Sequence, residues 1–381
     1  MLIDAVAGVG REASRRAGEI EALRRLPDDL AGALIDTGVF KACVPACYGG
    51  GEVAMTELLT ALEELAYHDG STAWCAMIGA TTGLTAAFLP ADHAARIYGD
   101  PRAATAGYAL PAAKGRVVDG GLVVSGRWSW GSATQHCTWI GGGCFVVDDA
   151  GERVALADGT RAPFVFFERD QVELLDTWRV AGLRGTGSTD YAVTEQFVPE
   201  GRWVQPGQTA AVVDVPAARF PFLGALALGV CSVGVGLARR ALDELVELAA
   251  SKRPVQSERT LAERPVVQMQ VAQAEAAWRS ARAFVREVVD EAWHEAAAGR
   301  SLSTEHKRAL RLAATNAAWR SADAVDLAYH AAGGSSIHES SPLQRIFRDV
   351  HVLTQHGMIA ERTFEPLGRR ALGLPTDASP L

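Results

Sequence analysis

The sequence is poor in cysteine and has no pattern typical of a metal site. Six of its 381 residues are cysteine, and none of them forms a C-x-x-C pair. An even number in so long a chain is weak evidence for disulfide bonds, so we interpret the cysteines as reduced thiols of the core. His351 and His356 are five residues apart, which is a poor spacing for one face of a helix, and no H-E-x-x-H motif occurs. We therefore expect no metal.

Positive charge and export signals are also scarce. The chain has 37 Lys and Arg against 45 Asp and Glu, a net charge of −8, which argues against a nucleic-acid partner. An acid at Asp4 and nearby arginines leave no apolar signal-peptide core. The longest apolar run, residues 220–237, contains Pro221 and four glycines. It predicts a buried helix rather than a membrane span, so we expect a cytoplasmic protein with no membrane partner.

The nucleotide-binding and hydrolase motifs with a known mechanism are missing too. The glycines in residues 182–187 and 234–236 do not complete G-x-G-x-x-G after a strand. Neither a P-loop nor a G-x-S-x-G elbow occurs. The chain therefore has no recognisable cradle for a dinucleotide or a triphosphate.

What the sequence does contain indicates three parts, as its length also favours. Residues 1–103 read as a helical domain, with helical patterns such as the leucines of residues 56–68. Residues 104–212 read as a small β-domain. Val117 to Val124 surround an Asp-Gly-Gly turn, which predicts a hairpin. Further strands are expected at residues 139–147, 164–167 and 191–198.

Residues 213–381 read as a helical bundle. Apolar residues recur at alternating spacings of four and three from Val267 to Ala292, a seam that requires a partner helix along its length. A second long helix is expected after residue 310 and ends at Gly333-Gly334.

Three segments contain candidate functional residues. Residues 124–134 place Trp130 two residues before Ser132 at a strand end, which suits a planar heteroaromatic ligand but equally suits core tryptophans beside a turn. Residues 176–188 alternate glycines and hydroxyls and could approach an anionic group, or form a solvated loop. Residues 333–356 contain a turn that leads into a helix. Its Arg345, Arg348 and Asp349 are typical of an internal salt bridge, and His356 follows them.

Together these motifs resemble the acyl-CoA dehydrogenase superfamily, and more closely its branch of flavin-dependent monooxygenases from two-component systems. The resemblance depends on the order of LPDDL, YGG, DGSTAW, VSGRWSWGS, GLRGTGS and SSPLQRIFRDVHVLTQH along nearly the whole chain. It implies a mainly α fold with a central β-domain: an N-terminal helical domain, a β-barrel-like middle domain and a C-terminal four-helix bundle. It also implies a homotetramer assembled through the bundle.

The resemblance assigns several residues to a flavin site. Trp130, Gly131 and Ser132 fall where the family packs on the isoalloxazine, with Ser132 at its N5. Gly357 occupies the position at which many dehydrogenases carry a glutamate as the catalytic base, and a glycine cannot act as a base. A glutamate in an earlier helix stays open as the base. His356 matches the histidine of the monooxygenase branch and is expected to be the catalytic base or hydrogen-bond donor.

The implied function is a reduced-flavin-dependent monooxygenase that acts on a small organic substrate through a C4a-hydroperoxyflavin. A separate flavin reductase would supply reduced FMN or FAD. Trp74 and Thr82 are expected in the substrate pocket. Thr82 stands about where phenol hydroxylases carry a second histidine, which argues against a phenol and leaves a neutral or amine substrate open. The R-x-x-F-G motif for the FAD pyrophosphate is missing, with Arg253 or Arg259 as substitutes.

Two other functions remain. One is an FAD-containing acyl-CoA dehydrogenase-like enzyme that oxidises an acyl thioester. The other is a non-catalytic bundle protein that binds no flavin.

Overall fold

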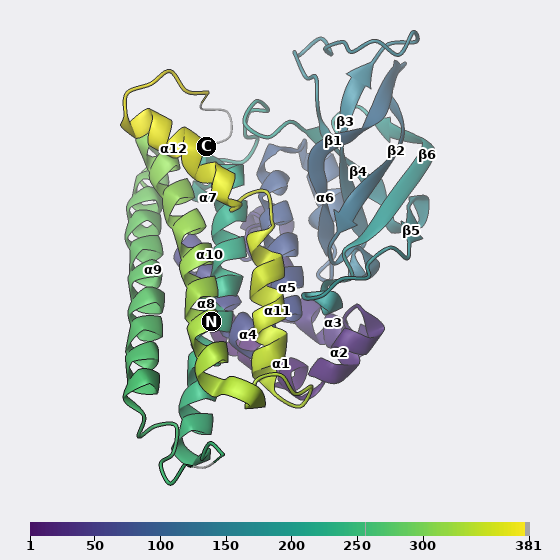
Figure 1. Cartoon of the computed structure of the whole chain (residues 1–381). Helices are drawn as coiled ribbons and strands as arrows, with labels where there is room; N and C mark the ends of the chain where they lie inside the picture. The colour runs from purple at the N-terminus through teal and green to yellow at the C-terminus, as the bar shows by residue number, and fades with distance from the viewer. Residues whose placement is uncertain (256, 378–381) are drawn as a thin grey trace.

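One β-sheet lies between two helical parts in the order of the chain, and in space it lies to one side of them (Figure 1). The computed structural model describes residues 1–255 and 257–377. The predicted fold class, mainly α with a central β-domain, is confirmed.

Short polar signals set the ends of the N-terminal helices. Two acids occupy the first turn of the helix that begins at Asp28, and Gly38, with φ +80°, follows its end. The side chain of Asp69 accepts the backbone N–H of Thr72 at 2.8 Å, so it caps one helix directly after another ends. The helices are α1 (Leu2–Arg15), α2 (Ala17–Leu23), α3 (Asp28–Asp36), α4 (Met55–His68), α5 (Gly70–Thr82) and α6 (Ala91–Tyr98).

The middle part folds as a single seven-stranded sheet in the order β5-β6-β2-β1-β3-β4-β7. The predicted hairpin is confirmed, because Val118 of β1 pairs with Gly121 of β2 around a two-residue turn. β1 and β3 run parallel, and the other neighbouring pairs are antiparallel. The strands are β1 (Thr105–Val118), β2 (Gly121–Gly131), β3 (Trp139–Val147), β4 (Phe164–Glu168), β5 (Glu173–Leu175), β6 (Thr189–Pro199) and β7 (Trp203–Val204).

Long helices form the C-terminal bundle. The seam that begins at Val267 lies on one helix, α9, whose alternating apolar residues are mostly buried where it packs on its neighbours α8 and α10. The predicted partnered seam is therefore confirmed. The bundle elements are α7 (Pro216–Arg219), α8 (Phe222–Ser251), α9 (Pro265–Ala297), α10 (Thr304–Ala332), α11 (Pro342–Thr354) and α12 (Phe364–Ala371).

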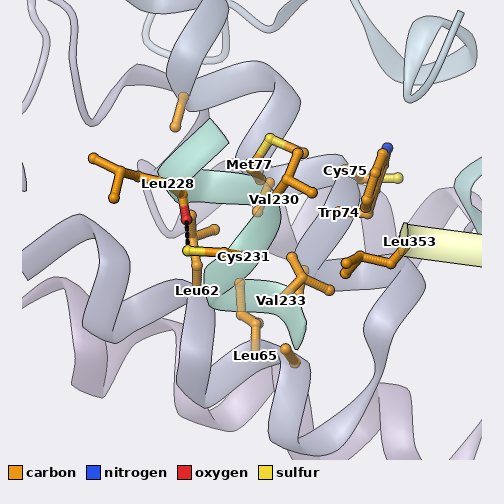
Figure 2. Packing of buried hydrophobic residues seen from close by; sticks show 14 of the residues in the cluster. Leu62, Leu65, Trp74, Cys75, Met77, Leu228, Val230, Cys231, Val233 and Leu353 are labelled. Carbon is orange, nitrogen blue, oxygen red and sulfur yellow. Dashed lines mark hydrogen bonds between the residues drawn. The ribbon is translucent and has the colours of Figure 1, made fainter. Parts of the chain in front are cut away.

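Helix α8 is the core helix that joins the two helical parts. It is long and apolar enough to cross a membrane by composition, but 78% of its most apolar stretch is buried inside the protein. Figure 2 shows its residues between those of α4, α5 and α11. A Cβ on Gly236 would lie 2.3 Å from the carbonyl oxygen of Glu63, so this glycine lets α8 approach α4 closely. All six cysteines are free, and Cys47 is the exposed one.

Candidate active site

A cavity of about 680 Å³ lies where the sheet meets both helical parts, within the range of small-molecule sites. It is lined mainly by apolar and aromatic side chains from α5, the edges of β1, β2 and β4, the segment after β5, the start of α8 and the end of α11. The lining residues used below are Trp74, Thr81, Thr82, Tyr108, Trp130, Ser132, Trp178, Leu183, Thr186, Ser188, Phe222, His356, Gly357 and Arg362.

Buried hydroxyls form a connected chain on one wall of the cavity. Ser132 Oγ accepts the indole N–H of Trp74 at 3.1 Å and lies 2.6 Å from Ser188 Oγ. Ser188 Oγ lies 2.7 Å from Thr186 Oγ1, which donates to the carbonyl oxygen of Leu183 at 2.8 Å. Ser132, Thr186 and Ser188 are each at most 5% exposed. Water is therefore largely excluded from these linked hydroxyls.

Trp130, two residues before Ser132, is 60% exposed although its ring is large and apolar. Its φ of +59° lies in the left-handed region, which a bulky residue adopts only when its surroundings require it. Its ring lies 5.8 Å from that of Tyr108, centroid to centroid, beside the cavity. The strand end therefore presents an unfilled aromatic surface to whatever enters.

His356 lies at the end of α11 and is held in one tautomer. Its Nδ1 accepts the backbone N–H of Met358 at 3.3 Å, so the hydrogen of the neutral ring is on Nε2. Burial, together with the charge of Arg311, lowers the pKa of His356 to about 4. The imidazole is therefore neutral near pH 7 and acts as a donor through Nε2.

Carboxylates are missing from the described residues that line the cavity, and Arg362 is the charged side chain among them. Its guanidinium nitrogen lies 3.5 Å from the point that a Cβ on Gly357 would occupy. A positive charge therefore lies beside the position where a dehydrogenase base was considered. The earlier-helix alternative also finds no support, since α8 contributes Phe222, Leu223 and Leu226 to the lining.

Comparison with known proteins agrees with this geometry. Residues 1–91 match the model of the acyl-CoA dehydrogenase N-terminal domain, and residues 228–361 match that of the acyl-CoA dehydrogenase C-terminal domain. The chain is 34% identical over 359 residues to indole-3-acetate monooxygenase of Pseudomonas putida, which covers 94% of this chain and 90% of that one. The chain belongs to the acyl-CoA dehydrogenase family.

Other relatives place it in the flavin-dependent monooxygenase branch of the acyl-CoA dehydrogenase family. It is 30% identical over 378 residues to the oxygenase subunit HsaA of Mycobacterium tuberculosis, covering 94% of this chain and 92% of HsaA. The HsaA crystal structure superposes with a TM-score of 0.89 over 99% of this chain and 98% of HsaA, at 27% identity. XiaF from Streptomyces, solved with FADH2 and glycerol, superposes with a TM-score of 0.92 over 98% of this chain and 95% of XiaF, at 24% identity. The protein is a flavin-dependent oxidoreductase, and a monooxygenase rather than a dehydrogenase.

The residues present fit a flavin. The cavity has the volume for a planar ring system and a small second molecule, and Trp130 offers an aromatic surface beside it. Ser132 offers a buried oxygen at the same strand end. No group of three or more metal-ligating side chains occurs among residues 1–255 and 257–377.

The structure brings most of the predicted site residues to this one cavity. Trp74, Thr82, Trp130, Ser132 and His356 all line it. Thr82 Oγ1 donates to the carbonyl oxygen of Ile78 at 2.8 Å, so its hydrogen is used within the helix. Gly131 ends β2 between Trp130 and Ser132, and a Cβ there would lie 2.7 Å from the ring of Tyr191. Their roles toward a flavin stay predictions.

Arg253 is not among the residues that line the cavity. It follows the far end of α8, and the stretch of helix from Leu226 to Ser251 is roughly 37 Å long. Within one chain Arg253 is therefore remote from Ser132. Its predicted contact with a flavin remains a prediction that requires another copy of the chain.

Thr186, Ser188 and Arg362 line the cavity but were not predicted as site residues. The segment 176–188 was interpreted as an anion-binding or solvated loop, yet it packs against α11. Asp349 Oδ1 accepts the backbone N–H of Leu183 at 2.6 Å, and Arg348 donates to the carbonyl oxygen of Ala181. The alternation of glycines and hydroxyls was the available signal, because only small residues allow this packing.

Proposed function

We propose that the protein is the oxygenase component of a two-component flavin system and transfers one oxygen atom to a small aromatic substrate. The observation that carries this proposal is the cavity. It combines an exposed indole, a buried serine and a neutral histidine with no carboxylate among its described lining residues. Removal of a proton next to a thioester requires a base, whereas oxygen transfer requires a dry cavity with hydrogen-bonding groups.

The cofactor in this proposal is reduced FMN or FAD, delivered by a separate reductase, since the chain has no dinucleotide motif. When bound, the reduced flavin would supply the electrons and the position that reacts with oxygen.

The chain's own residues bind the flavin, orient the substrate and keep out water. Trp130 would pack on the ring system, and Ser132 would contact its N5. His356 directs its Nε2–H into the cavity and orients the substrate or the oxygen to be transferred. The apolar lining limits the entry of water, which suppresses wasteful release of peroxide.

The proposed substrate is a planar aromatic molecule with an anionic group. Trp74, Trp178 and Phe222 provide flat apolar surfaces in the lining. Arg362 has no ion-pair partner among the described residues and can hold a carboxylate at the cavity edge. The relative named indole-3-acetate monooxygenase is named for a substrate of this class.

We also propose a cytoplasmic homotetramer. Val246 of α8 and Val266 and Met269 of α9 each expose more than half of their surface. The contacts of Arg239 with Glu275 and of Val235 with Trp278 together show that α8 and α9 run antiparallel. This brings the three exposed residues to the same end of the bundle. An apolar patch on a bundle surface favours association with further copies.

The test supplies the full-length protein with free reduced FMN or FAD and ¹⁸O₂, and offers indole-3-acetate, indole, phenol and butyryl-CoA in turn. Mass spectrometry is expected to find one ¹⁸O atom in the product of indole-3-acetate, with the second atom reduced to water. Anaerobic bleaching of bound FAD by butyryl-CoA would contradict the proposal and identify a dehydrogenase. Absence of flavin binding would contradict both the monooxygenase proposal and the dehydrogenase alternative.

A further inference from the structure

The direction of every hydrogen bond in the hydroxyl chain follows from the end at Leu183. A carbonyl oxygen only accepts, so the single hydroxyl hydrogen of Thr186 goes to Leu183. Thr186 therefore accepts from Ser188 at 2.7 Å. The hydrogen of Ser188 is then used, so Ser188 accepts from Ser132 at 2.6 Å.

The other end of the chain is compatible with this direction. An indole nitrogen only donates, and Trp74 donates to Ser132 Oγ at 3.1 Å. Ser132 thus gives its hydrogen to Ser188 and takes one from Trp74. It keeps one lone pair and no hydrogen for a ligand.

We propose that Thr186 and Ser188 make Ser132 an obligate hydrogen-bond acceptor, so that the cavity selects the reduced over the oxidised flavin. This inference rests on the proposed function, in which Ser132 faces N5 of the ring. Reduced flavin carries a hydrogen on N5, whereas N5 of oxidised flavin carries only a lone pair. The oxidised ring would therefore set one buried lone pair against another.

Burial of Thr186 and Ser188 increases the free-energy difference between binding of the reduced and of the oxidised flavin. Thr186 and Ser188 are 2% and 3% exposed, so water does not readily supply the missing hydrogen. A buried polar group left unpaired costs about 1–3 kcal/mol, and the lower part of that range already corresponds to about 10-fold in affinity. Thr186 and Ser188 are positioning residues, because they act through Ser132.

The variant Thr186→Val keeps the shape of the side chain and removes its hydroxyl. The hydrogen of Ser188 then has no acceptor at residue 186 and can turn toward Ser132. Ser132 in turn can donate to N5 of oxidised flavin. The ratio of the oxidised to the reduced dissociation constant is expected to fall about 10-fold. For a two-electron couple this lowers the midpoint potential of the bound flavin by about 30 mV.

The experiment measures dissociation constants of oxidised and photoreduced FMN and FAD, the latter under anaerobic conditions, together with the midpoint potential. Ser188→Ala is expected to behave as Thr186→Val does and replaces it if that variant does not fold. Thr186→Ser keeps a hydroxyl for Leu183 and is expected to retain the wild-type ratio. Thr81→Val is the matched control, since Thr81 lines the same cavity but donates to Met77 at 2.8 Å.

The outcomes separate this inference from the proposed function. Wild-type protein that binds neither redox form contradicts the proposed function itself. Wild-type protein that binds reduced flavin, with an unchanged ratio in Thr186→Val and Ser188→Ala, overturns only the inference. An equal loss of affinity for the oxidised and the reduced flavin also overturns the inference, because a merely structural role weakens the binding of both forms.

Discussion

The imidazole of His356 meets the indole of Trp74 edge to face, with the ring centroids 5.4 Å apart. The same indole donates its N–H to Ser132, so one tryptophan of α5 contacts both proposed functional residues, which lie just after α11 and β2. The three parts of the chain therefore meet at Trp74.

Replacement of His356 tests its role in the chemistry. His356→Ala is expected to lower product formation by about 100-fold or more, the range for a positioned proton donor or acceptor, while flavin binding is retained. His351→Ala is the matched control, because His351 pairs with Asp326 at 2.8 Å. Steady-state turnover and flavin titration measure the two effects. Undiminished turnover in His356→Ala would show that the histidine is structural.

The pH profile tests the protonation state of His356. Its lowered pKa of about 4 means that the neutral form is present throughout the range from pH 6 to pH 9. Product formation per bound reduced flavin is expected to show no histidine-like transition near pH 6.5 in the wild type. A transition there that disappears in His356→Gln would contradict this assignment.

Ser132→Ala tests the proposed contact with N5. Loss of the serine oxygen removes the hydrogen-bond partner of the ring, so we expect more hydrogen peroxide and less product for each flavin consumed. Peroxide and product are quantified in the same reaction. Ser129→Ala on the same strand is the control, as Ser129 does not line the cavity. An unchanged peroxide-to-product ratio would rule out the contact.

Trp130→Ala tests the exposed aromatic surface. An aromatic pair contributes about 0.5–1.5 kcal/mol beyond area burial, so flavin affinity is expected to fall roughly 2- to 10-fold. Stability should change little, because the ring is 60% exposed. Phe197→Ala, which removes another exposed ring from the sheet, is expected to leave flavin affinity unchanged. Equal effects of the two substitutions would argue against a specific contact.

Asp349→Asn tests the buried acid that holds the segment after β5. Burial raises the pKa of Asp349 to about 7, well above its ordinary value of 3.8. The folded protein therefore keeps this proton at pH values where the unfolded chain loses it, and the stabilisation present below pH 4 is lost as pH rises through 7.

The asparagine variant can still accept from Leu183 but has no proton to lose. The free energy of unfolding of the wild type, measured relative to that of Asp349→Asn, is expected to fall by a few kcal/mol between pH 4 and pH 8. Denaturant unfolding at several pH values measures the difference. A pH-independent difference between the two proteins would contradict the raised pKa.

Local patterns predicted much of the fold. The Asp-Gly-Gly turn identified the hairpin of β1 and β2, and the apolar seam of α9 identified a partnered helix, because both signals depend on neighbours in the sequence. Motif order likewise led to Trp130, Ser132 and His356. Each of these carries a residue type that the flavin chemistry needs.

The remaining part of the site depends on contacts between distant segments. Thr186 and Ser188 are ordinary loop hydroxyls until the fold places them 2.7 Å apart and Ser188 within 2.6 Å of Ser132, 56 residues earlier. Arg362 borders the cavity from the segment after α11. No spacing along the chain indicates either contact.

The central claim is that this chain, supplied with reduced flavin, reacts with oxygen as a monooxygenase. Rapid mixing of the anaerobic protein–reduced flavin complex with oxygenated buffer, followed by near-ultraviolet absorbance, tests it most directly. The account predicts a long-lived band from the oxygen adduct of the flavin before oxidised flavin forms. Direct reoxidation without that band, with FMN and with FAD and also in the presence of substrate, would contradict it.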